Sequence, residues 1–297
     1  MIVRMMGKWI EAMRLRTIPV SISGVLAGTG LAIWQGAFSI VPAVLCLAFA
    51  VTAQIASNFA NEYYDYMNGM DRKGREGFRR GVTEGDISPQ AMKLATFGML
   101  GLAALAGCAM LFIGGWWLLP VGICILLAAL AYSTGPYPLS HHGLGDITVI
   151  MFFGVVPVTL TYWLQTGEWT DMPVVLTGSV AVGLLAANVL IVNNYRDMDD
   201  DKAVGKRTTV VIFGRKVMGM AYLLSGILAM ALLFPLWLEL PVWALAVPAI
   251  YLLLHIRTWH RLVTNTGAVL NPVLGITARN LLMFSLMLLF TLVIDTL

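Results

Sequence analysis

Residues 39–65 read SIVPAVLCLAFAVTAQIASNFANEYYD, an apolar run that ends in amide and carboxylate side chains. Residues 173–201 read PVVLTGSVAVGLLAANVLIVNNYRDMDDD and repeat that order. In each stretch an Asn stands four residues before an Asp, Asn61 before Asp65 and Asn193 before Asp197. Residues four apart share one face of a helix, so each run directs an amide oxygen and a carboxylate to the same side. A charged side chain at the bilayer centre costs about 2.5 to 3.5 kcal/mol, so these carboxylates need a compensating partner.

Composition places both runs in a membrane. The chain has 297 residues, of which 59% are hydrophobic and 12% charged, and its mean hydropathy is +0.80. These values are typical of a polytopic helical membrane protein. We therefore expect an all-α integral membrane protein, a single domain over residues 1–297, with nine transmembrane helices around a central cavity. The expected spans are residues 18–35, 39–60, 92–113, 116–133, 147–165, 173–194, 217–238, 241–256 and 273–294, of which the eighth is the shortest.

Charge placement predicts the topology. If the chain starts in the cytoplasm and crosses at each run, every Lys and Arg except Arg279 lies in the N-terminal tail or in, or at the border of, an even-numbered loop. This satisfies the positive-inside rule, and it predicts a bacterial cytoplasmic (inner) membrane protein with the N-terminus and the motif-bearing loops in the cytoplasm. The net charge of +3 is divided among short loops beside spans, so it does not indicate nucleic-acid binding.

The two motifs lie four predicted helices apart, which suggests two weakly repeated Asp-rich halves with a shared site between them. Asn and Asp oxygens suit Mg²⁺, which binds through one or two carboxylates together with substrate phosphates. Neighbouring Lys and Arg residues would neutralise the remaining anionic oxygens. The recurring spacing favours a functional role for Asp65, Asp197 and Asp201. Asp199 and Asp200 are instead expected to be solvated loop charges that pair with neighbouring Arg and Lys residues.

Five further stretches complete the pattern: WIEAMRLRTIP at 9–19, GPYPL at 135–139, GLG at 143–145, GKRT at 205–208 and LNP at 270–272. With these stretches and the paired motifs, the chain resembles the UbiA-type membrane prenyltransferases, and within that family the branch that prenylates 1,4-dihydroxy-2-naphthoate in menaquinone biosynthesis. The spacing of six residues from Asp65 to Asp71 also resembles this branch. Glu62 departs from the residue common in the family, and Phe78 departs from the one common in this branch.

The resemblance implies the site residues and the reaction. Mg²⁺ and, through it, a polyprenyl diphosphate would bind at Asn61, Asp65, Asp71, Asn193, Asp197 and Asp201. Diphosphate oxygens would contact Arg80, Lys206 and Arg207. The resemblance implies that the prenyl group passes to the aromatic acid with loss of CO₂, giving demethylmenaquinone, with Asp65 and Asp197 essential for catalysis.

Other residues have weaker signals. Tyr63, Tyr64, Tyr132 or Tyr195 would stabilise an allylic cation through the ring face, and Tyr132 is preferred because it precedes the GPYPL loop. The carboxylate of the acceptor would be bound by Arg16 or Arg14, although topology alone explains both residues. We expect His141 and His142 to lie in a solvated loop.

Several alternatives remain open from sequence. The acceptor could be 4-hydroxybenzoate, homogentisate or a glyceryl phosphate. A CDP-alcohol phosphotransferase would need an Asp-x-x-Asp-Gly-x-x-Ala-Arg run, which the sequence lacks. A cation-coupled transporter would place its charges at the bilayer midplane rather than in two loops. Prenyl chain length, metal count and oligomeric state are not encoded in the motif spacing.

Overall fold

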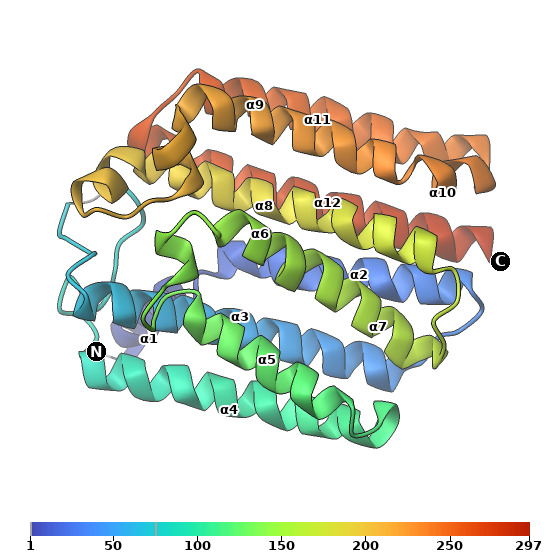
Figure 1. Ribbon diagram of the computed structural model, residues 1–297, viewed down its shortest axis with the longest axis horizontal. Helices are drawn as coiled ribbons and strands as arrows, with labels where there is room; N and C mark the ends of the chain where they lie inside the picture. Colours follow the sequence, from blue (N-terminus) through green and yellow to red (C-terminus); the bar gives the residue numbers. More distant parts are fainter. Residues whose placement is uncertain (1, 75) are drawn as a thin grey trace.

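The computed structural model describes residues 2–74 and 76–297, with side chains from residue 6 onward. Within that part of the chain all regular structure is helical, as the sequence predicts, and the long helices form one elongated bundle (Figure 1). These are α2 Ile18–Trp34, α3 Ile40–Met67, α4 Pro89–Gly114, α5 Leu118–Ala131, α8 Met172–Ala203, α9 Thr209–Leu232, α11 Ala246–Val263 and α12 Asn271–Asp295. A further rod consists of α6 Gly145–Val149, the π-helix η3 Ile150–Val155 and α7 Val156–Thr166. The short elements are α1 Ile2–Met13, α10 Phe234–Glu239 and the 3-10 turns η1 Leu15–Thr17, η2 Leu139–His141, η4 Val242–Leu245 and η5 Gly267–Leu270.

The number of membrane crossings depends on α5. Eight helices in the described part of the chain are long and apolar enough to span a membrane. The expected short eighth span belongs to a helix of 22 residues, Val242–Val263, whereas α5 has only 14 residues. At 1.5 Å per residue α5 reaches about 21 Å, less than the hydrocarbon core of about 30 Å. Length therefore does not confirm the ninth span, although the two chain ends lie at opposite ends of the bundle (Figure 1), as an odd number of crossings requires.

The two helices that carry the motifs extend beyond their apolar runs. Helix α3 continues to Met67 rather than ending near residue 60, and α8 continues to Ala203 rather than ending near residue 194. The Asn-x-x-x-Asp segments of both motifs are therefore helical, not parts of loops, whereas Asp71 follows the end of α3. Hydropathy marks where the apolar surface ends, whereas the backbone hydrogen bonds of a helix continue into a polar segment when its side chains find partners.

Several helix starts follow directly from the sequence. Proline stands in the first turn of α2, α4, α8 and α12, where its missing N–H is not needed. Ser88 and Thr208 cap α4 and α9, their hydroxyl oxygens accepting hydrogen bonds from the backbone N–H groups of Ala91 and Val211.

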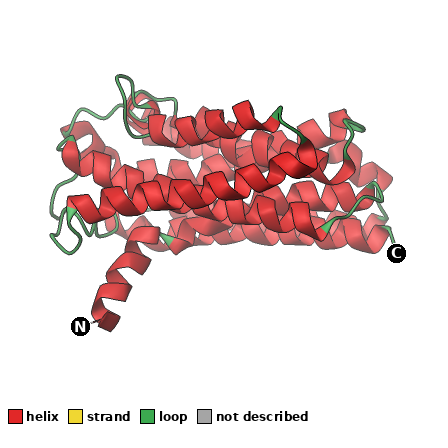
Figure 2. Cartoon of the chain, turned by 90° about the horizontal axis from the view of Figure 1, so that it is seen from below, coloured by secondary structure: helices red, strands yellow, loops and turns green. Residues whose placement is uncertain are grey.

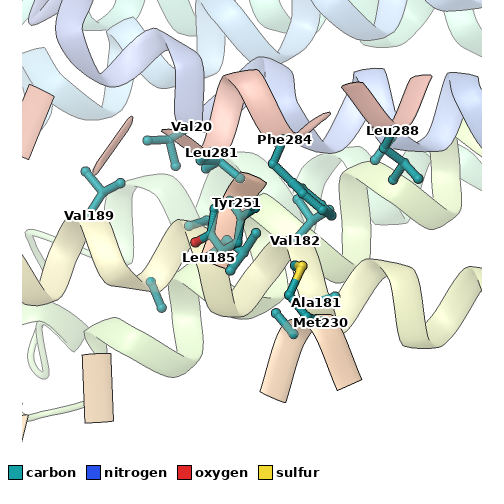
Figure 3. Close-up of a cluster of buried hydrophobic side chains, with 14 of the residues drawn as sticks. Val20, Ala181, Val182, Leu185, Val189, Met230, Tyr251, Leu281, Phe284 and Leu288 are labelled. Carbon is teal, nitrogen blue, oxygen red and sulfur yellow. The ribbon is translucent and has the colours of Figure 1, made fainter. Parts of the chain in front are cut away.

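The core is centred on α8, which packs among α2, η3, α9 and α12. Figure 3 shows side chains of α8, such as Val182 and Leu185, against Leu281 and Phe284 of α12. A glycine contact brings η3 against α8, since a Cβ added at Gly154 would lie 2.4 Å from the Cα of Gly183. Small residues allow this close approach, which drives association of helices in lipid. The tight core fixes the end of α8 that carries the second motif.

Candidate active site

The first motif forms a hydrogen-bonded cluster at one end of the bundle. Asn61 Nδ2 donates to Asp65 Oδ2 at 3.1 Å, which confirms that the two side chains share a helix face. The same amide donates to Ser133 Oγ at 3.2 Å. Asn61 Oδ1 accepts from the guanidinium groups of Arg14 at 2.9 Å and Arg80 at 3.3 Å. The amide therefore links α3 to three other segments of the chain.

A lysine joins the two motifs. Lys206 Nζ lies 4.0 Å from Asp65 Oδ2 of the first motif and 3.9 Å from Asp201 Oδ1 of the second. Both aspartates are buried, Asp65 at 2% and Asp201 at 5% exposure. Buried carboxylates require counter-charges or hydrogen bonds, and one ammonium between them supplies positive charge to both. The motifs, more than 120 residues apart in sequence, therefore face one another.

The six-residue spacing to Asp71 results from a tight turn after α3. The backbone N–H groups of Met70 and Asp71 both donate to the carbonyl oxygen of Asp65, at 2.8 and 3.3 Å. Gly69 permits the turn because its φ is 68°, in the left-handed region. The turn brings Asp71 back over the helix end, where its carboxylate lies 3.4 Å from Arg80 Nε.

The second motif is organised around a buried arginine. Arg196 donates to both carboxylate oxygens of Asp197, at 2.6 and 2.8 Å, and to Asn193 Oδ1 at 2.9 Å. It also donates to Asn271 Oδ1 at 3.0 Å, at the start of α12. A bidentate guanidinium–carboxylate pair is geometrically specific, so Arg196 fixes the orientation of two expected metal ligands and joins them to α12.

Two cavities meet beside these motifs. A polar cavity of about 150 Å³ is lined in part by Arg14, Arg80, Asn193 and Lys206. An apolar cavity of about 220 Å³ extends between α3, α4, α5 and α7. The lining residues that the two cavities share are Gln54, Ser57, Tyr132 and Phe153. A charged head group and a long apolar tail of one molecule would be accommodated by this pair of cavities.

Comparisons with known proteins identify the family. The pattern of the UbiA prenyltransferase family matches residues 21–271. The chain belongs to the UbiA prenyltransferase family. It is therefore an integral membrane prenyltransferase.

Relatives of this UbiA-family chain include two bacterial enzymes. It is 39% identical to 1,4-dihydroxy-2-naphthoate octaprenyltransferase of Escherichia coli K12 over 69% of this chain and 68% of that protein. It is 36% identical to the enzyme of the same name from Mycobacterium tuberculosis H37Rv over 79% of this chain and 80% of that protein.

Solved structures share the fold. A UbiA homolog from Archaeoglobus fulgidus bound to DMAPP and Mg²⁺ superposes with a TM-score of 0.67 at 16% identity, covering 95% of this chain and 99% of that one. The apo structure of a UbiA homolog from Aeropyrum pernix K1 gives a TM-score of 0.71 at 17% identity, covering 94% and 98%.

The donor set of this UbiA-family site fits a metal that arrives with phosphate. Among the described residues, no three His, Cys, Asp or Glu side chains are grouped so that they could hold a metal ion by themselves. The carboxylates of Asp65, Asp201 and Asp71 are oxygen donors, each within 4.0 Å of a cationic side chain. Magnesium completes its shell with water and substrate phosphate, so a site built from separated carboxylates suits it.

The structure separates the predicted basic residues into two groups. Arg80 and Lys206 line the polar cavity. Arg207 is exposed, and its backbone N–H, not its side chain, contacts the His141 carbonyl at 3.0 Å. Arg16 is also exposed and covers the ring of Phe78, with Cζ 3.3 Å from the ring centroid. The structure therefore does not place the Arg16 and Arg207 side chains in the cavity.

Of the two arginines that the sequence suggested for the acceptor carboxylate, Arg14 rather than Arg16 lies at the polar cavity. It lines the polar cavity and contacts Asn61. Its φ of 51° turns the chain between α1 and η1 and directs the two arginines differently. No periodicity argument predicts such a break at a non-glycine residue.

Two other expectations about side-chain environment were wrong. His141 is not solvated: it is 8% exposed, and its Nε2 lies 3.4 Å from Asp65 Oδ1. Asp200 pairs with Arg72, as predicted, but its side chain is only 15% exposed and accepts a hydrogen bond from the Glu76 N–H at 2.9 Å, so it is not a solvated charge. Asp199 is 79% exposed, as predicted.

The residue changes that depart from the family pattern have local roles. Glu62 is 1% exposed, and its Oε1 accepts from the backbone N–H of Val82 at 3.0 Å, which holds the segment after Arg80 against α3. The ring of Phe78 contacts two guanidinium groups, with Cζ of Arg16 3.3 Å and Cζ of Arg196 4.9 Å from the ring centroid. Neither change removes an expected ligand.

Proposed function

We propose that this UbiA-family protein transfers a polyprenyl group from an allylic diphosphate to 1,4-dihydroxy-2-naphthoate, in a reaction that depends on Mg²⁺ and releases CO₂. The observation that carries the proposal is the joining of the two motifs by Lys206 beside a polar cavity that continues into an apolar one. The names of the bacterial relatives support the naphthoate as acceptor.

The six motif side chains would hold the metal. When bound, Mg²⁺ would neutralise charge on the diphosphate oxygens and so favour departure of that group. The proposed ligands are Asn61, Asp65, Asp71, Asn193, Asp197 and Asp201.

Basic side chains of the cavity would bind the leaving group. Arg80 and Lys206 line the cavity, and each already faces motif carboxylates. They would stabilise the charge that develops as the allylic carbon–oxygen bond breaks and the diphosphate leaves with the bonding electrons. Positive groups fixed before the reaction need no reorganisation in the transition state.

Tyr132 would face the allylic cation. It borders both cavities, at the point where the head group of a prenyl diphosphate would pass into its tail. An aromatic ring face stabilises a nearby cation by about 0.5 to 2 kcal/mol. The remaining isoprene units would lie in the apolar cavity between α3, α4, α5 and α7.

The acceptor would enter the polar cavity beside Arg14. That guanidinium would bind the carboxylate of the naphthoate and orient the ring toward the cation. The ring carbon bearing the carboxyl group forms the new carbon–carbon bond, CO₂ leaves without its bonding electrons, and these electrons restore the aromatic ring.

We also propose the bacterial cytoplasmic membrane as the location, with the N-terminus and the motifs on the cytoplasmic side. Both motifs and the N-terminus lie at one end of the bundle (Figure 1), and every Lys and Arg of the sequence except Arg279 falls on that side under the positive-inside rule.

A prenyl-transfer assay tests the proposal. Purified protein receives one labelled polyprenyl diphosphate, with and without Mg²⁺, and either 1,4-dihydroxy-2-naphthoate or 4-hydroxybenzoate. We expect Mg²⁺-dependent prenylation of the naphthoate with an equal amount of CO₂. Homogentisate is offered in a further parallel reaction. Transfer only to 4-hydroxybenzoate or homogentisate would overturn the acceptor, and absence of transfer to all three would overturn the function.

A further inference from the structure

Helix α1 leaves the bundle at Arg14. By composition alone, residues 6–34 would count as one continuous membrane span. The left-handed conformation of Arg14, with φ 51° and ψ 52°, interrupts that helix, and η1 follows before α2 begins. Figure 2 shows α1 projecting away from the bundle at a steep angle to the long helices. It therefore does not cross the membrane with them.

The sides of α1 differ in polarity. At 100° per residue, Met6, Ile10 and Met13 lie on one side of the helix, and Lys8 and Glu11 lie on the other. Met6 is 59% exposed and Ile10 is 48% exposed. Trp9, at the edge of the apolar side, packs edge-on against Phe59 of α3, with ring centroids 5.6 Å apart, so α1 is attached to the bundle along only part of its apolar side.

The polar side of α1 is directed to the segment of residues 79–87, which precedes α4. Lys8 Nζ lies 2.5 Å from Asp86 Oδ1. Glu11 Oε2 lies 3.9 Å from a guanidinium nitrogen of Arg79, which also pairs with Asp86. The next residue is Arg80, which contacts Asn61 and Asp71 of the first motif. The polar side of α1 thus supports the segment that brings Arg80 into the site.

We propose that α1 lies in the headgroup layer of the membrane, with Met6 and Ile10 in contact with acyl chains, and that it thereby anchors segment 79–87 over the site. The partner is the surface of the same bilayer that surrounds the bundle. Trp9 of α1 packs in a hydrophobic cluster with Phe59 of α3 and Met92 of α4, Met6 and Ile10 stay exposed, and the polar side faces segment 79–87. An amphipathic helix buries such an apolar side about 5 to 10 Å into the headgroup boundary.

The charged residues of α1 predict how its binding depends on the lipid headgroup. Lys8 is already paired with Asp86, and Glu11 adds a negative charge on the same side. With Arg4 included, the charged residues of α1 sum to only +1. Binding should therefore depend mainly on burial of apolar side chains and much less on anionic lipid. This holds whichever aromatic acceptor the enzyme uses.

Spin-label accessibility tests the placement. A label is attached to cysteine at position 6, 10 or 11 of the full chain, after replacement of Cys46, Cys108 and Cys124 by alanine, in nanodiscs of either phosphatidylcholine or phosphatidylglycerol. Position 11 is the matched control, because Glu11 lies on the polar side of α1 and its side chain is 58% exposed. For each label, the collision rate with oxygen is divided by the collision rate with a water-soluble nickel complex. We expect this ratio to be at least threefold higher for labels 6 and 10 than for label 11, in both lipids. Equal accessibility at the three positions would overturn the placement, and an effect confined to phosphatidylglycerol would overturn the apolar mechanism.

Trypsin cleavage after Arg79 and Arg80 tests the anchoring without measuring activity. Lys8→Met keeps the stem of the side chain but removes the pair with Asp86. We expect it to raise the cleavage rate in nanodiscs severalfold, and Met6→Asp with Ile10→Asp should do the same. Lys93→Met removes an exposed lysine at the start of α4 and should leave the rate unchanged. If Lys8→Met is cleaved no faster than Lys93→Met, α1 does not anchor the segment.

Discussion

The substitution Asp65→Asn tests the central carboxylate of the site with little change of shape. Asp65 Oδ2 accepts from Asn61 at 3.1 Å and lies 4.0 Å from Lys206, and Oδ1 lies 3.4 Å from His141. The amide retains one oxygen for these contacts but loses the negative charge that would bind metal and balance Lys206. Loss of one preorganised electrostatic contact typically costs about 100- to 1,000-fold in kcat, or about 3 to 4 kcal/mol. We expect the prenyl-transfer rate to fall by at least that factor.

The assay compares initial rates of naphthoate prenylation at saturating Mg²⁺, after thermal unfolding has shown that the variant is folded. Asp199→Asn is the matched control: Asp199 is 79% exposed and pairs with Arg215 at the surface. Such surface pairs contribute about 0 to 1 kcal/mol, so this variant should retain most of the activity. A rate for folded Asp65→Asn within about tenfold of wild type would refute the assignment of Asp65, since the expected loss starts at about 100-fold.

Three further predictions concern other parts of the molecule. Tyr132→Leu should lower kcat roughly 2- to 30-fold, because the variant lacks the ring face that would stabilise the cation. Tyr132→Phe keeps the ring and should therefore keep kcat near that of wild type. The kcat values of the two variants, measured side by side, decide this. Gly154→Ala should lower the stability by about 1 to 3 kcal/mol, because a Cβ there would lie 2.4 Å from the backbone of α8. Thermal unfolding should show this loss and little change for Gly101→Ala, where nothing lies within 4 Å. The hydrogen bond from Lys8 lowers the pKa of Asp86. The Lys8–Asp86 pair therefore stabilises the fold at pH values above the usual carboxyl pKa of about 3.9. This stabilisation is lost as the pH falls through the lowered pKa of Asp86, because the carboxylate becomes protonated. The difference in Tm between wild type and Lys8→Met should therefore disappear in acid, and a difference that persists there would contradict the role of Asp86.

The sequence by itself determined the class of protein and the local geometry of the motifs. Apolar runs of spanning length require helices in lipid, because every backbone polar group must be satisfied within its own segment. Helical periodicity alone placed Asn61 and Asp65 on one face, and the structure confirms it with a direct hydrogen bond. These features depend on residues close together in the chain, so the spacing contains the information.

Only the tertiary structure decided which distant residues meet. The approach of His141 to Asp65 and the position of Lys206 between Asp65 and Asp201 join different elements. The choice of Arg14 rather than Arg16 for the cavity depends on one backbone break. Such contacts follow from how the helices pack and where each turn directs the chain, and small residues such as Gly154 set that packing through the space they leave. Spacing along the sequence does not specify these distances, because they are set by the packing of the whole bundle.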